Sequence, residues 1–199
     1  LAYFNNMVGN QDLADKSDIE LVQLTLADQE NFLYLVNRYE SKLLKFIYRI
    51  SGLSFEDSQD LLQEVFIKVY QNLNDFDQSL KFSSWIYRIT RNQVISNYRK
   101  YKSRPQMSLF DLDLESCEQL VSGFDISQDI DQGILRKKIS QVLAHLDSKY
   151  QEVMVLKYLE DKSYEEISDI IKKPVSTVGT LIRRGKIFFY QEFKKQKYE

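Results

Sequence analysis

Two segments of this chain begin with the same signature, a serine followed three residues later by a glutamate. The first is Ser17-Asp18-Ile19-Glu20 and the second is Ser163-Tyr164-Glu165-Glu166. In such a capping box, the serine hydroxyl accepts a hydrogen bond from the third backbone N–H of a helix, and the glutamate reaches back to the serine N–H. Apolar residues recur at helical spacing after each box. The sequence therefore predicts helices that start at both sites.

Breakers of this helical pattern are scarce, with six glycines and two prolines among 199 residues. This scarcity excludes a turn-rich sandwich or barrel and a glycine-rich nucleotide-binding fold, so we expect an all-α protein. The single Cys117 and the single His145 exclude an intrachain disulfide framework and sites built on several cysteines or histidines. No apolar run approaches the roughly 18 residues of a membrane span, so we expect no membrane insertion and a cytoplasmic location.

The near-neutral net charge of −2 hides a strong charge asymmetry along the chain. Residues 101–133 hold two basic and seven acidic residues, whereas residues 134–199 hold 14 basic and nine acidic ones. We expect a tail over 1–16, a small helical domain over 17–102, a flexible acidic linker over 103–133 and a second small helical domain over 134–199. The last of these carries the basic excess that a nucleic-acid partner requires.

A helix-turn-helix is predicted around Lys173-Pro174, with one helix over 163–172 and the next from about 176 to 194. On the second helix Val178, Ile182 and Phe189 cluster inward. The outward side carries small hydroxyls, which allow close approach to DNA, and bases that reach phosphates or guanine edges. These residues are Ser176, Thr177, Thr180, Arg183, Arg184 and Lys186. An ordinary helical hairpin with a solvated basic face is the alternative.

Residues 81–104 contain seven basic residues, no acidic one, and several interleaved aromatic rings. Rings stack on unpaired bases while lysine and arginine follow the phosphates, so this stretch predicts contact with opened nucleic acid. On a helix, Phe82 and Ile86 share the face opposite Arg88 and Arg91, and Tyr87 flanks this basic side. The alternative for Trp85 is an ordinary place in the core.

The helix expected over 54–73 is acidic: from 54 to 80 there are six acidic residues and one basic residue. Asp60 and Glu64 are one turn apart and share a face with Gln63 beside them. A metal-dependent enzyme built on these two carboxylates lacks further ligands and a nucleophile. A solvated face and a docking surface for a basic partner remain the two alternatives.

Together these segments resemble the sigma-70 family of RNA polymerase sigma factors, in its extracytoplasmic-function (ECF) type. The resemblance covers roughly 17–102 and 134–195. It rests on DLLQEVF (60–66), FSSWIYRI (82–89) and RN (91–92) in the first domain, and on SYEEI (163–167) and VSTVGTLIRR (175–184) in the second. Gly179 and Ser176 depart from the family, which often has a basic residue and a glycine at these places, so the −35 preference stays open.

The resemblance implies a role for each segment. The acidic helix would dock on the coiled coil of the polymerase β′ subunit through Asp60, Gln63 and Glu64. The stretch 76–102 would bind and help open the −10 promoter element, and the helix-turn-helix would read the −35 element through the six residues named above. The −10 candidates are Lys81, Trp85, Tyr87, Arg88, Arg91, Asn92 and Arg99.

The expected protein is thus a non-enzymatic transcription initiation factor with no metal or cofactor, which binds the RNA polymerase core (β′ and β subunits) and promoter DNA. An anti-sigma protein is an expected partner, because similar factors are often held inactive by one. The expected location is the bacterial cytoplasm, at the nucleoid when in holoenzyme. A stand-alone DNA-binding regulator is the rival class, but it leaves the acidic helix and the basic-aromatic stretch unexplained.

Overall fold

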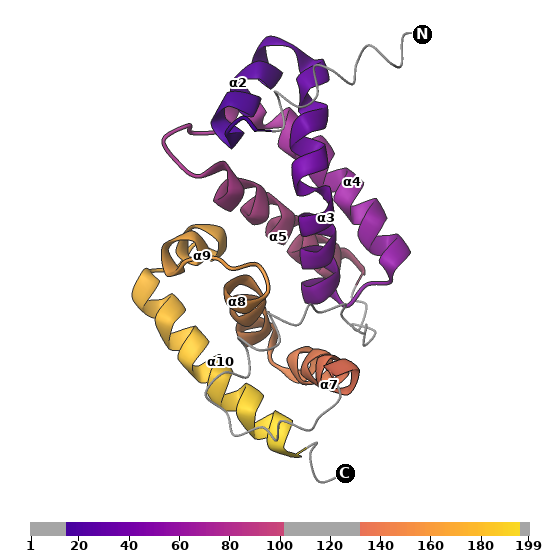
Figure 1. The fold of residues 1–199 in the computed structure, drawn as a ribbon, viewed down its shortest axis with the longest axis vertical. Helices are drawn as coiled ribbons and strands as arrows, with labels where there is room; N and C mark the ends of the chain where they lie inside the picture. Colours follow the sequence, from indigo (N-terminus) through magenta and orange to yellow (C-terminus); the bar gives the residue numbers. More distant parts are fainter. Residues whose placement is uncertain (1–14, 102–131, 196–199) are drawn as a thin grey trace.

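The computed structural model describes residues 15–101 and 132–195, which form eight α-helices and two short 3-10 turns (Figure 1). No strand occurs in these residues, so the all-α prediction is confirmed. None of the helices described there is long and apolar enough to cross a membrane. Most of the expected tail and most of the expected acidic linker lie outside the described residues.

Four helices form the N-terminal group, which we call the first module: α2 (Asp18–Ala27), α3 (Phe32–Ser51), α4 (Phe55–Gln71) and α5 (Phe82–Tyr101). The capping box at Ser17 and Glu20 is formed, as predicted. Gly52 ends α3 in the left-handed region at φ 68°, a conformation that glycine adopts without strain. The Ser54 hydroxyl then accepts from the Asp57 N–H and starts α4.

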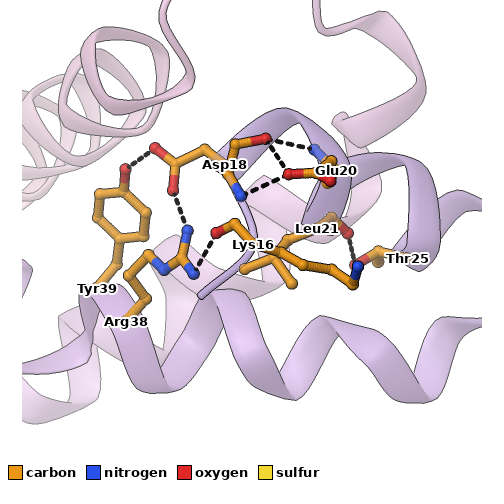
Figure 2. Close-up of polar contacts among 8 residues, drawn as sticks. Lys16, Asp18, Glu20, Leu21, Thr25, Arg38 and Tyr39 are labelled. Carbon is orange, nitrogen blue, oxygen red and sulfur yellow. Dashed lines mark hydrogen bonds and ion pairs between the residues drawn. The ribbon is translucent and has the colours of Figure 1, made fainter. Parts of the chain in front are cut away.

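A polar network joins α2 to α3 (Figure 2). Asp18 Oδ1 lies 2.8 Å from Arg38 Nη1, and the Tyr39 hydroxyl donates to Asp18 Oδ2 at 2.5 Å. Arg38 also donates to the carbonyl of Lys16 at 2.7 Å. Burial and the bond to Asp18 raise the pKa of the Tyr39 hydroxyl, so it stays a proton donor. The Tyr39 ring in turn meets Phe82 edge-on at 5.6 Å, which ties the start of α5 to α3.

The C-terminal group, the second module, holds α7 (Gln132–His145), α8 (Ser148–Tyr158), α9 (Tyr164–Ile171) and α10 (Val175–Lys195). The second capping box, Ser163 with Glu166, starts α9 as predicted. Lys172 leaves the helix in a left-handed conformation, and the Ser168 hydroxyl donates to the Lys173 carbonyl at 2.6 Å across the turn. The predicted helix-turn-helix is therefore present as α9, this turn and α10.

Two glycines on α10 have different surroundings. A Cβ at Gly185 would lie 3.0 Å from Met154 Cγ and 3.1 Å from its sulfur, because α10 crosses α8 closely at this point. A Cβ at Gly179 would meet only Tyr164, at an ordinary 3.7 Å. Packing thus accounts for Gly185, while nothing in the fold requires glycine at position 179.

The two modules pack against each other, with α9 lying along α5 and α8 against α3 (Figure 1). One apolar cluster runs through both modules: Phe46 and Ile86 of the first belong to the same buried group as Leu156 and Ile167 of the second. A smaller cluster, which includes Val142 and Phe189, holds α7, α8 and α10 together. The sequence predicts two domains, and in this structure they share a core.

Candidate nucleic-acid interface

The acidic candidates on α4 lie on its solvent side. Asp60, Gln63 and Glu64 are exposed, whereas Leu61 and Val65 of the same helix are buried. Glu64 also accepts a hydrogen bond of 2.5 Å from the Gln93 amide, and Gln93 accepts one from Lys68. This chain of contacts joins the acidic face of α4 to α5. The surface is available for a partner in the structure as it stands.

The basic-aromatic candidates, six on α5 and Lys81 directly before it, divide into three groups by exposure. Lys81, Asn92 and Arg99 are exposed, and Arg88 and Arg91 are half-buried. Trp85 and Tyr87 are buried, with 8% and 1% of their surface exposed. The helix therefore does not present all seven predicted residues to solvent on one face.

Trp85 packs as a core residue with one edge at a recess. Its ring lies 5.2 Å from that of Phe76 and 5.5 Å from that of Phe82, centroid to centroid. The recess beside it has a volume of about 310 Å³. Its lining is rich in amides and hydroxyls and consists of Lys68, Asn72, Asp75, Trp85, Ile89, Asn92, Gln93 and Ser96. Of the predicted −10 residues, Trp85 and Asn92 are brought together at this recess.

Three other −10 candidates, two on α5 and Lys81 directly before it, face the second module. The Tyr87 hydroxyl donates to Glu160 Oε2 at 2.6 Å, and Arg91 pairs with Glu152. The Lys81 ammonium lies 3.4 Å from Glu166 Oε1. Tyr87 is predicted to flank the exposed basic side, whereas the structure buries it, because its ring packs 5.0 Å from that of Phe46 on α3 and its hydroxyl meets Glu160 in the α8–α9 connection.

The centre of this contact is a buried ion pair that the sequence reasoning missed. Arg49 Nη1 lies 2.9 Å from Glu160 Oε1, with only 4% and 6% of the two side chains exposed. Arg49 also donates to the Leu159 carbonyl at 3.3 Å, and Gln151 donates to the Arg49 carbonyl at 3.0 Å. Burial raises the pKa of the Glu160 carboxyl, against the opposing effects of Arg49 and Tyr87.

One sequence signal points to Arg49. The buried stripe of α3 runs through Tyr39, Leu43 and Phe46, and the next step of three residues reaches Arg49. A charge that continues an apolar stripe indicates a buried partner of opposite sign. The identity of that partner, 111 residues away, has no signature in the sequence.

The candidates on α10 all lie toward solvent. Ser176, Thr180, Arg183 and Arg184 are exposed, and Thr177 and Lys186 are half-buried. The Thr180 hydroxyl donates to the Ser176 carbonyl at 3.0 Å, and the Lys186 ammonium lies 5.1 Å from the ring of Tyr158. On the opposite side Val178, Ile182 and Phe189 are buried, as predicted. The structure therefore groups the six predicted residues on the side of α10 away from its buried apolar face, with Thr177 and Lys186 at the half-buried edges.

Comparison with known families matches the two modules to two different family profiles. Residues 35–104 match the Sigma-70 region 2 profile, and residues 136–188 match the profile of Sigma-70, region 4. The first match contains α4 and α5, and the second contains α9, the turn and α10 as far as residue 188. Both matches together cover most of the residues that carry the candidate surfaces.

Curated relatives of similar length support the same assignment. The chain is 36% identical over 174 residues to the ECF RNA polymerase sigma factor SigW of Bacillus subtilis (strain 168), which covers 82% of this chain and 89% of the relative. It is 31% identical over 185 residues to the ECF RNA polymerase sigma-E factor of Escherichia coli (strain K12), with 89% and 93% covered.

Two solved structures share the fold. One is CnrH in complex with the cytosolic domain of CnrY, with a TM-score of 0.65, 22% identity, and 90% of this chain and 99% of that chain covered. The other is the sigma factor RpoE in complex with the anti-sigma factor NepR from Bartonella quintana, with a TM-score of 0.58, 16% identity, and 83% and 98% covered. From the family profiles and the curated relatives, this chain belongs to the sigma-70 family of RNA polymerase sigma factors, ECF type, and functions as a sigma factor in promoter-specific transcription initiation.

Proposed function

We propose that this sigma factor divides promoter recognition among three surfaces. The outward face of α10 reads the −35 element, the recess and exposed bases of α5 bind the opened −10 element, and the acidic face of α4 docks on core polymerase. The observation that carries the proposal is the outward face of α10, where exposed hydroxyls precede exposed arginines on a helix whose other side is buried.

For the −35 element the α10 face matches the demands of a major groove. Ser176 and Thr180 near the helix start are short, so the backbone can approach base edges closely. Arg183 and Arg184 follow one to two turns later, where a guanidinium reaches a phosphate or the O6 and N7 atoms of guanine. The first helix, α9, braces the second through buried Ile167 and Ile170, as in other helix-turn-helix proteins.

For the −10 element the recess beside Trp85 suits an unstacked base. Amide groups such as those of Asn92 and Asn72 can donate to and accept from the Watson–Crick edge of a base. Arg88 on the next turn of α5 can contact the backbone of the same strand. Because Trp85 is held by Phe76 and Phe82, its ring forms a wall of the recess rather than a free stacking platform.

For core polymerase the α4 face offers two carboxylates one turn apart, Asp60 and Glu64, on a helix whose inner side is fixed. We extend the β′ coiled coil to this chain as the docking partner, with the β subunit as a further contact. Both solved structures described above are complexes, and the second partner is named an anti-sigma factor. We therefore also propose an anti-sigma protein as a partner of this chain. The function is binding and positioning within the bacterial cytoplasm, with no enzymatic step.

The test uses purified chain and RNA polymerase core. The wild type should bind core and protect −35 and −10 DNA, whereas Arg183→Ala should weaken binding of an intact −35 duplex by about 1–3 kcal/mol. A scrambled −35 duplex is the matched control, and Arg183→Ala should bind it with the same affinity as the wild type. Equal affinity of wild type and variant for the intact duplex would remove the −35 role from α10.

A second arm tests docking. Asp60→Lys with Glu64→Lys should reduce core affinity while circular dichroism stays helical, because charge reversal repels a basic partner surface. Glu56→Lys on the same helix, nearer its start, serves as the matched control. If the chain bound promoter DNA tightly but never bound core, even at low salt, the stand-alone regulator would replace this proposal.

A further inference from the structure

The hydrogen bonds that join α4 to α5 lie at the recess beside Trp85. The Lys68 ammonium donates to Gln93 Oε1, and Gln93 Nε2 donates to Glu64 Oε2 at 2.5 Å. Lys68 and Gln93 both line the recess. Neither of them is a −10 candidate predicted from the sequence. The structure thus brings a cation and a buried amide to the recess in addition to the predicted Trp85 and Asn92.

The Gln93 amide has a fixed orientation. The residue is only 8% exposed, and the two ends of its amide face opposite charges. The oxygen accepts from the Lys68 ammonium, and the nitrogen donates to the Glu64 carboxylate. A half-turn of the amide would set its N–H groups against the ammonium and its oxygen against the carboxylate, so both contacts would become repulsive. Gln93 therefore keeps its oxygen toward Lys68.

This orientation determines where the Lys68 ammonium lies. A lysine has a flexible four-carbon stem and three N–H donors, and here Gln93 holds the end of the stem by one of them. The other two donors remain for acceptors at the recess. Within residues 15–101 and 132–195 Lys68 forms no ion pair with a carboxylate, although Asp75 also lines the recess. Its charge is therefore available to a group that enters the recess.

We propose that Gln93 is a positioning residue for base selection, which holds the Lys68 ammonium so that it donates to a carbonyl oxygen of the −10 base in the recess. This inference rests on the proposed −10 function of the recess. Guanine, thymine and cytosine carry such an oxygen, whereas adenine has none. A hydrogen bond from an ammonium is stronger than one between neutral groups. The recess therefore prefers a base with a carbonyl oxygen to adenine.

Two substitutions separate this role from that of a simple tie between α4 and α5. Gln93→Met keeps an unbranched side chain of similar size and leaves the charge of Lys68 in place, but it removes the oxygen that holds the ammonium. Lys68→Met removes the donor itself. Because Gln93 acts through Lys68, both changes together should cost no more discrimination than Lys68→Met alone. A tie between helices would instead affect every DNA strand alike.

The experiment measures the affinity of holoenzyme for DNA in which the −10 non-template strand is single-stranded and carries fluorescein. The promoter is one mapped with the same holoenzyme. An abasic site is placed at each −10 position in turn, and the position at which it weakens binding most is that of the captured base. The four bases are then compared at this position, with the abasic strand as the reference. Lys45→Met, at an exposed lysine on α3, is the matched control.

We expect wild-type holoenzyme to prefer a carbonyl base to adenine by about tenfold, the effect of one hydrogen bond from a charged donor. Gln93→Met should reduce this ratio to about twofold or less, because the donor is no longer held in place. Its affinity for the abasic strand and its salt dependence should stay at wild-type values, since the charge of Lys68 remains. Lys68→Met and the double variant should lose the ratio equally, whereas Lys45→Met should keep it. A ratio measured on one preparation does not depend on the fraction of folded protein.

Two results would overturn the role of Gln93. One is a preference for carbonyl bases that survives Gln93→Met or Lys68→Met. The other is a loss in Gln93→Met that is equal for all strands, the abasic one included, because Gln93 would then serve only the packing of α4 on α5. A wild-type preference for adenine would remove Lys68 as the donor to the base. Failure of the −10 function has a different signature, in which no abasic site weakens the binding of wild-type holoenzyme.

Discussion

The two glycines of α10 provide a quantitative test of how this fold is packed. Gly179→Ala should stabilise the chain by about 1 kcal/mol, because alanine is favoured over glycine in a helix interior by that amount. The added Cβ would meet only Tyr164 Cε2 at 3.7 Å, so no steric cost opposes the gain. For a chain of this size the melting temperature should rise by about 2–4 °C.

Gly185→Ala has the same intrinsic gain but a different outcome. Its Cβ would lie 3.0 Å from Met154 Cγ and 3.1 Å from the sulfur, so the methionine side chain would have to shift by a few tenths of an ångström. Overpacking of this kind costs about 1–3 kcal/mol, and the flexibility of methionine places the cost toward the lower end. We expect a net change between zero and about 1 kcal/mol of destabilisation.

A double-mutant cycle isolates the steric contribution. Met154→Ala removes the atoms that a Cβ at position 185 would strike, so in that background Gly185→Ala should regain its stabilisation of about 1 kcal/mol. Urea unfolding followed by circular dichroism measures all four proteins at one temperature. If Gly185→Ala stabilises the wild-type chain as much as Gly179→Ala does, the close approach of α8 and α10 has no energetic consequence and the argument fails.

Other predictions concern the recess and the second capping box. Trp85→Ala should lower the free energy of unfolding by about 3–5 kcal/mol, since the ring is packed in the core. Asn92→Ala, at the exposed rim, should leave stability within about 0.5 kcal/mol but impair promoter opening, which permanganate reactivity of −10 thymines measures; wild-type reactivity would remove Asn92 from the recess function. Ser163→Ala should destabilise α9 by about 1 kcal/mol at neutral pH. Burial alone would raise the pKa of Glu166, but the Ser163 N–H and nearby lysines lower it overall, so the contribution of the cap is present above the ordinary glutamate pKa and falls as pH drops through the lowered value. Glu166→Gln removes this charge and keeps the Ser163 hydroxyl, so a stability difference between wild type and Glu166→Gln that is constant from pH 7 to 3 would contradict this coupling.

Local patterns predict the helices of this chain well because their causes are local. The boxes at Ser17 and Ser163 start helices where the serine and glutamate side chains reach their own backbone. Gly52 ends α3 because its own backbone is in the left-handed conformation. The buried side of α10 follows from spacing alone, as Val178 and Ile182 show. Its polar side is exposed for the same reason.

The α5 surface shows where sequence patterns stop. From the sequence, Tyr87 and Arg91 are assigned to an exposed basic side of the helix. A periodicity argument assumes that a helix packs on one side only, so it leaves the other side exposed. In the structure α5 packs against α3 and α4 of its own module and against α9 of the second, where Glu160 and Glu152 bind these two residues. The sequence leaves two interpretations for Trp85, a ring that contacts DNA or a residue of the core. Its packing against the rings of Phe76 and Phe82 shows that it is a core residue.

The sequence by itself thus determines the helical class, the helix starts at the two capping boxes and the outward face of α10, because each depends on interactions within a few residues. Tertiary structure alone decides that Arg49 is buried against Glu160 and that the second module covers α5. Such pairings depend on the free energy of burying two distant surfaces together, which no local spacing records. Acidic residues of the second module and basic residues of the first pair with one another only because the two modules pack together.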